Sequence, residues 1–286
     1  MQLCKGQTGV VVGIQDVLFS QRSAYQHVQV WETDILGRMM TLDGIIMFTE
    51  HDEFVYHEML AHPALCLLGH APRVLIVGGG DGGALREVLR HAGVQAVDLV
   101  EIDELVIQAA RRYFPALGGS FDDPRVRIHV CDGIQFVRGA SVEMYDLVIV
   151  DSTDPHGFAE GLFAPPFYQA CARLLKPGGV FVTLSESPFD PAYHHLVGKV
   201  HRDLETCFPV VETYLAYIPT YQMGMWSFAF ASKRAHPVHD FDPAQAARLL
   251  QPFATQLRYY NPDVHRAAFA LPNFVRQLID ESYLST

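Results

Sequence analysis

The sequence predicts an α/β protein in which a small N-terminal β region precedes a larger domain with a parallel sheet. From residue 72 onward, short runs of Val, Ile and Leu alternate with stretches of helical periodicity, which is typical of a sheet covered by helices on both faces. The first fifty residues instead combine alternating apolar residues with the tight-turn signal Asp43-Gly44. We therefore divide the chain into a β domain with a linking helix at 1–70 and a second domain at 71–286.

The elements of the N-terminal region can be placed in order. A strand starts at Val10–Val12, and His27–Val30 alternates as a second strand does. Thr49 and Asp52 have the spacing of a capping box, which predicts that a helix begins after them. Apolar residues within 54–65 recur at helical intervals and extend that helix.

Five apolar runs in the second region predict buried strands at 74–77, 97–100, 126–130, 147–150 and 180–183. Helices separate these runs, and the last of these helices is expected to stop at Lys176–Gly179, where Pro and paired Gly follow a Lys. Parallel strands have their carboxyl ends at one edge of a sheet, and ligands bind outside that edge. The loops after residues 77, 100, 130 and 150 are therefore the expected site.

The composition restricts the class of partner. The 286 residues are 49% hydrophobic and include 21 Lys and Arg against 32 Asp and Glu, for a net charge of −11. This acidity argues against a nucleic-acid or anionic-membrane partner and is compatible with a cationic substrate.

No apolar run reaches the ~18 residues of a membrane span, and no signal-peptide core follows Met1. The five cysteines include no Cys-x-x-Cys pair, which favours reduced core thiols and a cytoplasmic protein. The 14 histidines have no metal-ligand spacing, so no metal site is predicted.

The first two predicted strand ends carry acids. Gly78–Gly83 matches G-x-G-x-x-G between a strand and a helix, which is by itself a weak nucleotide-binding signal. Glu101 ends the next strand, where an acid can accept ribose hydroxyls; alternatively it is an acid at a helix N-terminus, a role that Asp103 already fills. Asp81 disfavours a pyrophosphate in the turn and suits an adenosine ligand with a cationic tail. The alternative is that Asp81 caps the following helix.

Further acids follow the next two strands. Asp132 offers an acceptor for an adenine amine, and Gly133 beside it leaves room for the ring, although Asp also commonly caps helices. Asp151 and Asp154 lie three residues apart on a strand-end loop, where two carboxylates can hold and deprotonate a cationic amine. The alternative for this pair is a surface Asx turn. Tyr56, on the first helix, has the pattern of a half-buried packing residue.

Taken together, these motifs resemble the spermidine synthases, a family of polyamine aminopropyltransferases. The most specific stretches are VLIVGGGDGGALRE at 74–87, VEID at 100–103, DG at 132–133, DSTDP at 151–155 and PTY at 219–221. The stretches LDG at 42–44, DEFVYHEML at 52–60 and YYNPDVHRAAFALP at 259–272 extend the resemblance over nearly the whole chain after about Gly9. It implies a methyltransferase-like Rossmann domain after a small N-terminal β domain, which would gate the substrate site and join copies into a homodimer or homotetramer.

The resemblance also implies a reaction, aminopropyl transfer from decarboxylated S-adenosylmethionine to a diamine, with no cofactor or metal. With putrescine as the diamine, the products are spermidine and methylthioadenosine. The general base implied by the resemblance is Asp151. The implied amine-binding residues are Tyr56, His57, Asp81, Asp154, Glu186 and Tyr221. The implied donor-binding residues are Glu101, Asp132, Gly133, Asp81, Asp151 and Gln26, the last closing over the donor from the N-terminal domain.

Two residues depart from the family pattern. Met47 stands where the family usually has Gln, and Phe158 where it usually has Pro. Both are bulky and apolar on segments expected to border the site, which suggests a preference for another amine such as cadaverine.

Two further functions compete with aminopropyl transfer. One is a methyltransferase that uses intact S-adenosylmethionine, and the second is a non-catalytic polyamine-binding protein. Asp81 would repel the carboxylate of the intact donor, which disfavours the methyltransferase. A binding protein needs no positioned base such as Asp151, which disfavours the non-catalytic function.

Overall fold

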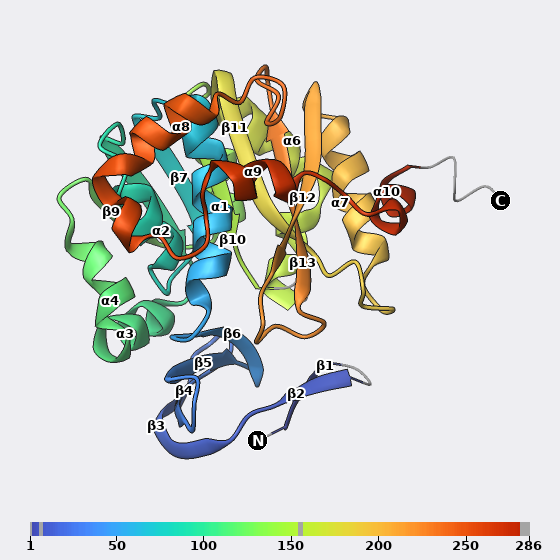
Figure 1. Cartoon of the computed structure of the whole chain (residues 1–286). Helices are drawn as coiled ribbons and strands as arrows, with labels where there is room; N and C mark the ends of the chain where they lie inside the picture. Colours follow the sequence, from blue (N-terminus) through green and yellow to red (C-terminus); the bar gives the residue numbers. More distant parts are fainter. Residues whose placement is uncertain (1, 6–7, 154–156, 281–286) are drawn as a thin grey trace.

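A computed structural model describes residues 2–5, 8–153 and 157–280 of the chain. In Figure 1 a small N-terminal sheet lies beneath a larger domain, whose central sheet is flanked by helices. The expected order, a β region followed by an α/β domain, is confirmed. Within these described ranges, none of the helices combines the length and the apolarity needed to span a bilayer.

The N-terminal region is built from antiparallel strands. A hairpin of β1 (Gln2–Lys5) and β2 (Thr8–Val11) precedes a sheet of β3 (Ile14–Arg22), β4 (His27–Thr33), β5 (Arg38–Leu42) and β6 (Ile45–Thr49). Asp43 (φ 49°) and Gly44 (φ 82°) both adopt the left-handed conformation, as a two-residue turn between β5 and β6 requires. The hairpin predicted from these two residues is therefore confirmed.

The main sheet contains every predicted apolar run. Its strands are β7 (Arg73–Gly78), β8 (Ala96–Glu101), β9 (Val126–Val130), β10 (Tyr145–Asp151), β11 (Leu175–Glu186), β12 (Val210–Tyr217) and β13 (Met225–Ser232), in the order β12-β13-β11-β10-β7-β8-β9. The strands β7 to β11 pair in parallel, as predicted. The sheet also contains two strands that were not predicted, and one of them, β13, runs antiparallel to both β11 and β12. The connection 218–224 is too short for the crossover that would make β12 and β13 parallel.

Helices cover both faces of the main sheet. One face carries α1 (Glu53–Leu68), α2 (Gly83–Leu89), α8 (Pro243–Leu250) and α9 (Pro262–Ala268), and the other carries α5 (Gly133–Gly139), α6 (Pro165–Leu174) and α7 (His195–Glu205). The remaining helices are α3 (Glu104–Tyr113) and α4 (Pro115–Gly118), beside the N-terminal sheet, and α10 (Asn273–Ile279), which packs on α7. Alternate residues of β7 enter the two cores, Val74 on the α1 side and Leu75 on the α6 side. Helix α6 ends at Leu174, two residues before the stop predicted at Lys176–Gly179. That stretch lies within β11, where the register against β10 shifts.

One face of the N-terminal sheet packs against the larger domain. Val28, Met40 and Phe48 share a hydrophobic cluster with Val106 of α3 and with Phe114. The helices α3 and α4 therefore lie against this sheet, as Figure 1 also shows. This contact fixes the β5–β6 hairpin near the carboxyl ends of the main-sheet strands.

Helix α1 starts in a different way from the predicted one. The Thr49 hydroxyl donates to Asp52 Oδ1 at 2.7 Å, and Asp52 makes no side-chain cap hydrogen bond, so the predicted capping box is wrong. The Asp52 carboxylate instead accepts hydrogen bonds from the Thr220 backbone N–H at 2.8 Å and from the Thr220 hydroxyl at 2.7 Å. Because Thr220 lies between β12 and β13, this buried contact joins the start of α1 to a loop at the edge of the sheet.

Candidate active site

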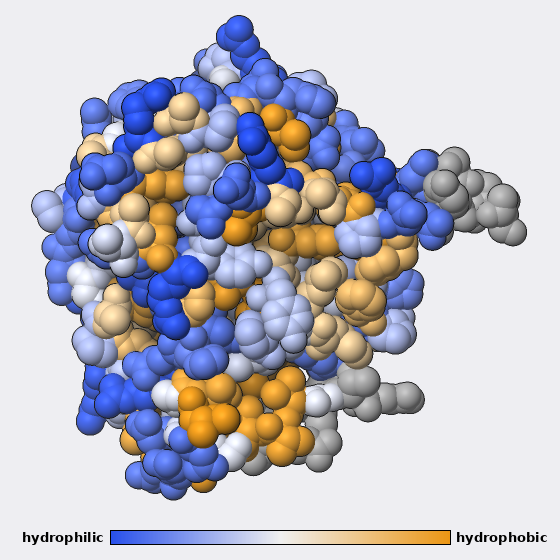
Figure 2. Space-filling model, in the orientation of Figure 1, coloured by the Kyte–Doolittle hydropathy of each residue, from blue (hydrophilic) through white to orange (hydrophobic). Residues whose placement is uncertain are grey.

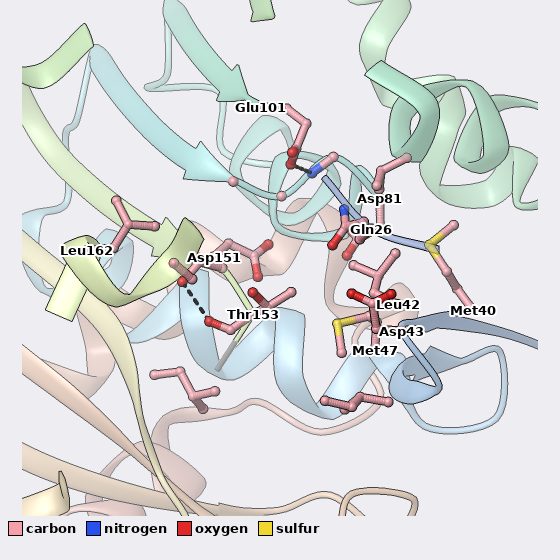
Figure 3. A pocket seen from close by; sticks show the side chains of 18 of the residues that line it. Gln26, Met40, Leu42, Asp43, Met47, Asp81, Glu101, Asp151, Thr153 and Leu162 are labelled. Atoms are coloured by element: carbon pink, nitrogen blue, oxygen red, sulfur yellow. Dashed lines mark hydrogen bonds between the residues drawn. The ribbon is translucent and has the colours of Figure 1, made fainter. Parts of the chain in front are cut away.

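A cavity of about 430 Å³ lies where the strands of the main sheet end and the β5–β6 hairpin covers them. The strand order reverses beside β7, and α/β sheets bind ligands at such a point. Residues from all four predicted loops line the cavity. Figure 3 shows Glu101 and Asp151 at strand ends, Asp81 in the turn after β7, and Met47 of the hairpin across the cavity from Glu101.

The glycine-rich turn after β7 brings Asp81 close to the end of β10. Gly78 (φ 84°) and Gly79 (φ 70°) have left-handed conformations that favour glycine. A Cβ on Gly78 would lie 2.0 Å from the Asp151 carbonyl oxygen, and the Gly79 N–H donates to that oxygen at 2.7 Å. The glycines therefore permit a close backbone approach that places Asp81 and Asp151 in one site.

Asp151 is buried at the end of β10. Its Oδ1 accepts a hydrogen bond from the Tyr56 hydroxyl at 2.8 Å, and its Oδ2 has no hydrogen-bond partner within the described part of the chain. Burial and the charge of Asp81 raise the pKa of Asp151 to about 7, although His57 and Tyr56 act in the opposite direction. Burial and the Asp151 charge hold the pKa of Tyr56 well above its usual range, so its hydroxyl stays a donor. Tyr56, expected to be half-buried, is in fact buried.

His57 lies between two acids. Its Nδ1 is 2.6 Å from Glu53 Oε2, and its Nε2 is 3.5 Å from Asp81 Oδ1. Burial alone would lower the pKa of His57, but Asp81 and Glu53 outweigh burial and raise this pKa to about 10. Spacing along the chain indicates no metal site, yet ligand-type atoms of His57, Asp81 and Asp151 lie within 4.8 Å of one another. The two carboxylates of this cluster can also accept hydrogen bonds from an ammonium group.

Two predicted donor-binding residues lie near the end of β8. Glu101 accepts hydrogen bonds from the N–H of Gly80 at 3.1 Å, drawn in Figure 3, and from the N–H of Asp103 at 2.9 Å. Burial raises the pKa of Glu101 to about 7 despite these bonds. Gln26 donates to Asp103 Oδ2 at 3.0 Å and so joins the β3–β4 loop to this strand end. Glu101 and Gln26 both line the cavity.

Asp132 and Gly133 line the cavity after β9. Asp132 Oδ1 accepts hydrogen bonds from the N–H groups of Ile134 at 2.7 Å and Gln135 at 3.3 Å, so it caps α5, the role that Asp commonly has at a helix start. A Cβ on Gly133 would lie 2.5 Å from Val77 Cγ1, so packing on β7 already requires a glycine there. Contact of these two residues with adenine stays a prediction.

An aromatic wall borders the cavity on the side of the β12–β13 connection. The ring centroids of Tyr56 and Tyr221 are 5.9 Å apart, and those of Tyr221 and Trp226 are 5.2 Å apart. The Tyr221 hydroxyl donates to the Met47 carbonyl oxygen at 2.6 Å. The wall therefore connects the Asp151 region with the N-terminal hairpin.

Sequence reasoning missed several residues of the site, namely Glu53, Asp190, Gln222 and Trp226. Asp190 and Gln222 line the cavity, and Gln222 Nε2 donates to Asp190 Oδ2 at 3.3 Å. Glu53 precedes His57 by four positions on one helix, a spacing that predicts contact between the two side chains. The remaining three residues come together through tertiary structure and have no comparable local signal.

Three predicted amine-binding residues, His57, Asp154 and Glu186, are not among the described residues that line the cavity. The His57 side chain is buried and meets Asp81, so its contact with an amine stays a prediction. Asp154 lies outside the described residues, as does the side chain of Phe158. Glu186 is buried at the end of β11 with φ 102°, and it is not among the described residues that line the cavity. Its carbonyl oxygen accepts a hydrogen bond from the Ser227 hydroxyl at 2.6 Å. Contact of Glu186 or Asp154 with an amine stays a prediction.

The strand order, with one antiparallel strand, and the cavity at the switch point define an α/β protein of the methyltransferase-like class. Residues 53–242 match the spermine/spermidine synthase domain, and residues 2–50 match the spermidine synthase tetramerisation domain. The chain belongs to the spermine/spermidine synthase family.

Proteins similar to this chain agree with that assignment. The polyamine aminopropyltransferase of Thermotoga maritima is 45% identical over 271 residues, which cover 94% of this chain and 89% of the relative. That of Alkaliphilus oremlandii is 41% identical over 270 residues, covering 94% and 93%. A crystal structure of spermidine synthase in complex with the transition state analogue AdoDATO has a TM-score of 0.90 at 44% identity, covering 96% of this chain and 91% of that one. The expected fold class and the expected enzyme class, a polyamine aminopropyltransferase, are confirmed.

We expect the activity to fall below neutral pH. If Asp151 is the base that the family resemblance implies, it must be ionised to accept a proton. Because its pKa is raised to about 7, kcat/KM for the aminopropyl donor should then fall about tenfold per pH unit below that value. The midpoint for kcat should lie lower, because a bound cation favours the carboxylate. Initial rates from pH 5 to 9 test this. A midpoint near the ordinary Asp value of ~3.9 would contradict it.

Proposed function

We propose that the chain transfers the aminopropyl group of decarboxylated S-adenosylmethionine to putrescine, giving spermidine and methylthioadenosine. The observation that carries this proposal is the buried Oδ2 of Asp151, which has no partner within the described residues and belongs to a cavity shared with Asp81. A buried carboxylate oxygen gains most from a charged N–H donor, and an alkylammonium group supplies one. The names of the relatives, polyamine aminopropyltransferase and spermidine synthase, agree with this substrate class.

In the proposed reaction, the amine nitrogen attacks the aminopropyl carbon that is bonded to sulfur. A C–N bond forms, and the C–S bond breaks with its electrons moving onto sulfur, so the sulfonium becomes a neutral thioether. As the nitrogen attacks, Asp151 Oδ2 accepts one proton of the substrate's ammonium group, which frees the lone pair that forms the C–N bond, while the Tyr56 hydroxyl holds Oδ1. A primary amine resembles Lys, whose pKa is ~10.4, so little of it is neutral at pH 7 and a base is needed. The proposed scheme uses neither a metal nor a cofactor.

The donor is proposed to lie across the strand ends of the main sheet. Glu101 would accept the ribose hydroxyls, since a carboxylate has about four acceptor positions and two of those on Glu101 are taken by backbone N–H groups. Asp132 and Gly133 would contact adenine, and Asp81 would bind the ammonium of the aminopropyl group. Gln26 would close over the donor from the β3–β4 loop.

The acceptor is proposed to lie along the aromatic wall that begins beside Asp151. Tyr56 and Tyr221 offer faces that pack against methylene groups and attract ammonium groups. His57, Asp154 and Glu186 would complete this amine site. Met47 adds an apolar side chain to the same cavity. Cadaverine has one methylene more than putrescine, and burying a CH₂ group is worth about 0.8 kcal/mol, so cadaverine is the second candidate acceptor.

Met47 provides a test of acceptor choice. Replacing Met47 by Gln should lower the ratio of kcat/KM for cadaverine to that for putrescine by about fourfold, because one methylene loses an apolar contact of about 0.8 kcal/mol. The matched control is Met47→Leu, which keeps an apolar side chain and should keep the ratio. An unchanged ratio in Met47→Gln would remove Met47 from the acceptor site.

The reaction itself can be tested by product analysis. Purified protein is incubated with decarboxylated S-adenosylmethionine and a panel of diamines, and products are identified by mass. Spermidine and methylthioadenosine are expected from putrescine. A methylated product from intact S-adenosylmethionine would favour a methyltransferase, and diamine binding without product would favour a non-catalytic binding protein.

Copies of the chain are proposed to associate through the N-terminal sheet. Apolar side chains gather over this region in Figure 2, and Val11 and Ile35 are 75% and 84% exposed. The match of residues 2–50 carries the description of a tetramerisation domain. Light scattering of the purified chain distinguishes a homotetramer from a homodimer, and a monomer would contradict the proposal.

A further inference from the structure

A row of alternating charges leads from the cavity into the interior between α1 and α2. Asp81 is followed by His57, Glu53, Arg86 and Glu87, with each neighbouring pair in contact. Arg86 donates from Nη1 to Glu53 Oε1 and from Nη2 to Glu53 Oε2, both at 2.9 Å. This two-point contact fixes the Glu53 carboxylate where its Oε2 meets His57 Nδ1.

The surroundings of His57 favour its charged form. Glu53 from α1 and Asp81 from the β7–α2 turn face its two ring nitrogens, and Asp151 from β10 lies in the same cluster. The Tyr56 ring packs at 5.3 Å, and the Phe48 ring of β6 lies at 6.4 Å with its edge toward His57. Each nitrogen can donate to its facing carboxylate only if both are protonated.

The charge of His57 matters because Asp81 and Asp151 are close together. Two neighbouring carboxylates repel each other, so one of them tends to hold a proton unless a cation lies beside them. Asp151 has to be ionised to act as the proposed base. Glu53 lies one residue further from the cavity and is placed to act on Asp151 through His57.

We propose that Glu53, fixed by Arg86, is a positioning residue that holds His57 as a cation and thereby keeps Asp151 ionised for proton transfer. This proposal rests on the proposed role of Asp151 as the base. Arg86 binds both oxygens of the Glu53 carboxylate, and the Glu53 side chain is only 10% exposed. The carboxylate is therefore held in one place beside His57.

Glu53→Gln and Arg86→Met both break the Glu53–Arg86 ion pair. Comparing them separates an effect of Glu53 on the charge of His57 from a purely structural effect of the ion pair. In Glu53→Gln, His57 loses the carboxylate that faces its Nδ1, while Arg86 stays nearby and keeps its contact with Glu87, so His57 should deprotonate more easily. The acidic limb of the pH profile of kcat/KM for the donor should then move upward by at least one pH unit, with at least about a fivefold loss at pH 7 and recovery toward wild type at pH 9. In Arg86→Met, Glu53 keeps its negative charge beside His57, so the acidic limb of the pH profile should stay at its wild-type position. Both variants should lose thermal stability to a similar extent.

The protonation of His57 can also be followed directly and without substrate. In ¹⁵N-histidine-labelled enzyme, with His57→Gln used to assign the signal, His57 should remain an imidazolium at pH 8 in the wild type and in Arg86→Met. In Glu53→Gln it should titrate at lower pH. A neutral His57 at pH 8 in the wild type would overturn the proposal, and so would equal shifts of the acidic limb in both variants or none in Glu53→Gln. Because this measurement needs no turnover, it remains decisive even if the expected products are not formed.

Discussion

Replacing Asp151 by Asn is expected to lower kcat by about 10²–10⁴-fold, the usual cost of losing a general base. The amide oxygen of Asn can still accept the Tyr56 hydroxyl that now binds Oδ1, so the local structure should be retained. The amide nitrogen that replaces Oδ2 cannot accept a proton. Rapid-quench or steady-state rates with decarboxylated S-adenosylmethionine measure the effect.

Binding of the product separates loss of chemistry from loss of structure in this variant. Methylthioadenosine is uncharged, so its affinity for Asp151→Asn, measured by calorimetry, should remain close to that of the wild type. The matched control is Asp132→Asn at the same edge of the sheet, since Asn is as good a helix cap as Asp. That control should change donor binding more than kcat. Activity of Asp151→Asn within a few-fold of wild type would mean that another group is the base.

The second large effect is expected for Asp81→Asn. Asp81 Oδ1 accepts a hydrogen bond from the Gly83 N–H at 2.6 Å, which Asn can preserve, so the turn should keep its shape. The variant loses the negative charge proposed to bind the donor's ammonium group. A hydrogen bond to a charged group is worth about 1.5–3 kcal/mol, so affinity for decarboxylated S-adenosylmethionine should fall by roughly 10- to 150-fold.

The comparison of three ligands makes the Asp81 prediction specific to charge. Intact S-adenosylmethionine carries a carboxylate that Asp81 repels, so its affinity should fall much less or should rise. Methylthioadenosine has no aminopropyl group and should bind unchanged. Equal losses for both sulfonium donors would show that Asp81 acts through the shape of the turn rather than through its charge.

The parts of the fold that were predicted have signals within a few neighbouring residues. Buried strands such as 74–77 are recognised as short apolar runs, and Asp43-Gly44 needs only a tight turn between apolar flanks. The antiparallel β13 was not predicted because the direction of a strand depends on how its connection closes. The capping box failed for a similar reason, since distant Thr220 binds the Asp52 carboxylate.

The site was predictable as a set of loops but not as a set of contacts. Strand-end acids such as Glu101 and Asp151 line the cavity because parallel strands end at one edge. For Asp132 the sequence allowed both adenine contact and helix capping, and only the structure shows that its Oδ1 caps α5. The contact between Asp190 and Gln222 had no signal in the sequence. Those contacts depend on side-chain directions and on segments far apart in the chain.

The β5–β6 hairpin, which covers the cavity, belongs to a different part of the chain from the acids beneath it. Met47 lies on a small sheet that packs on α3, whereas Asp81 and Asp151 follow strands of the main sheet. If Met47 contacts the amine as proposed, divergence within the hairpin would change which amine is accepted, while the acids at the strand ends of the main sheet stay the same.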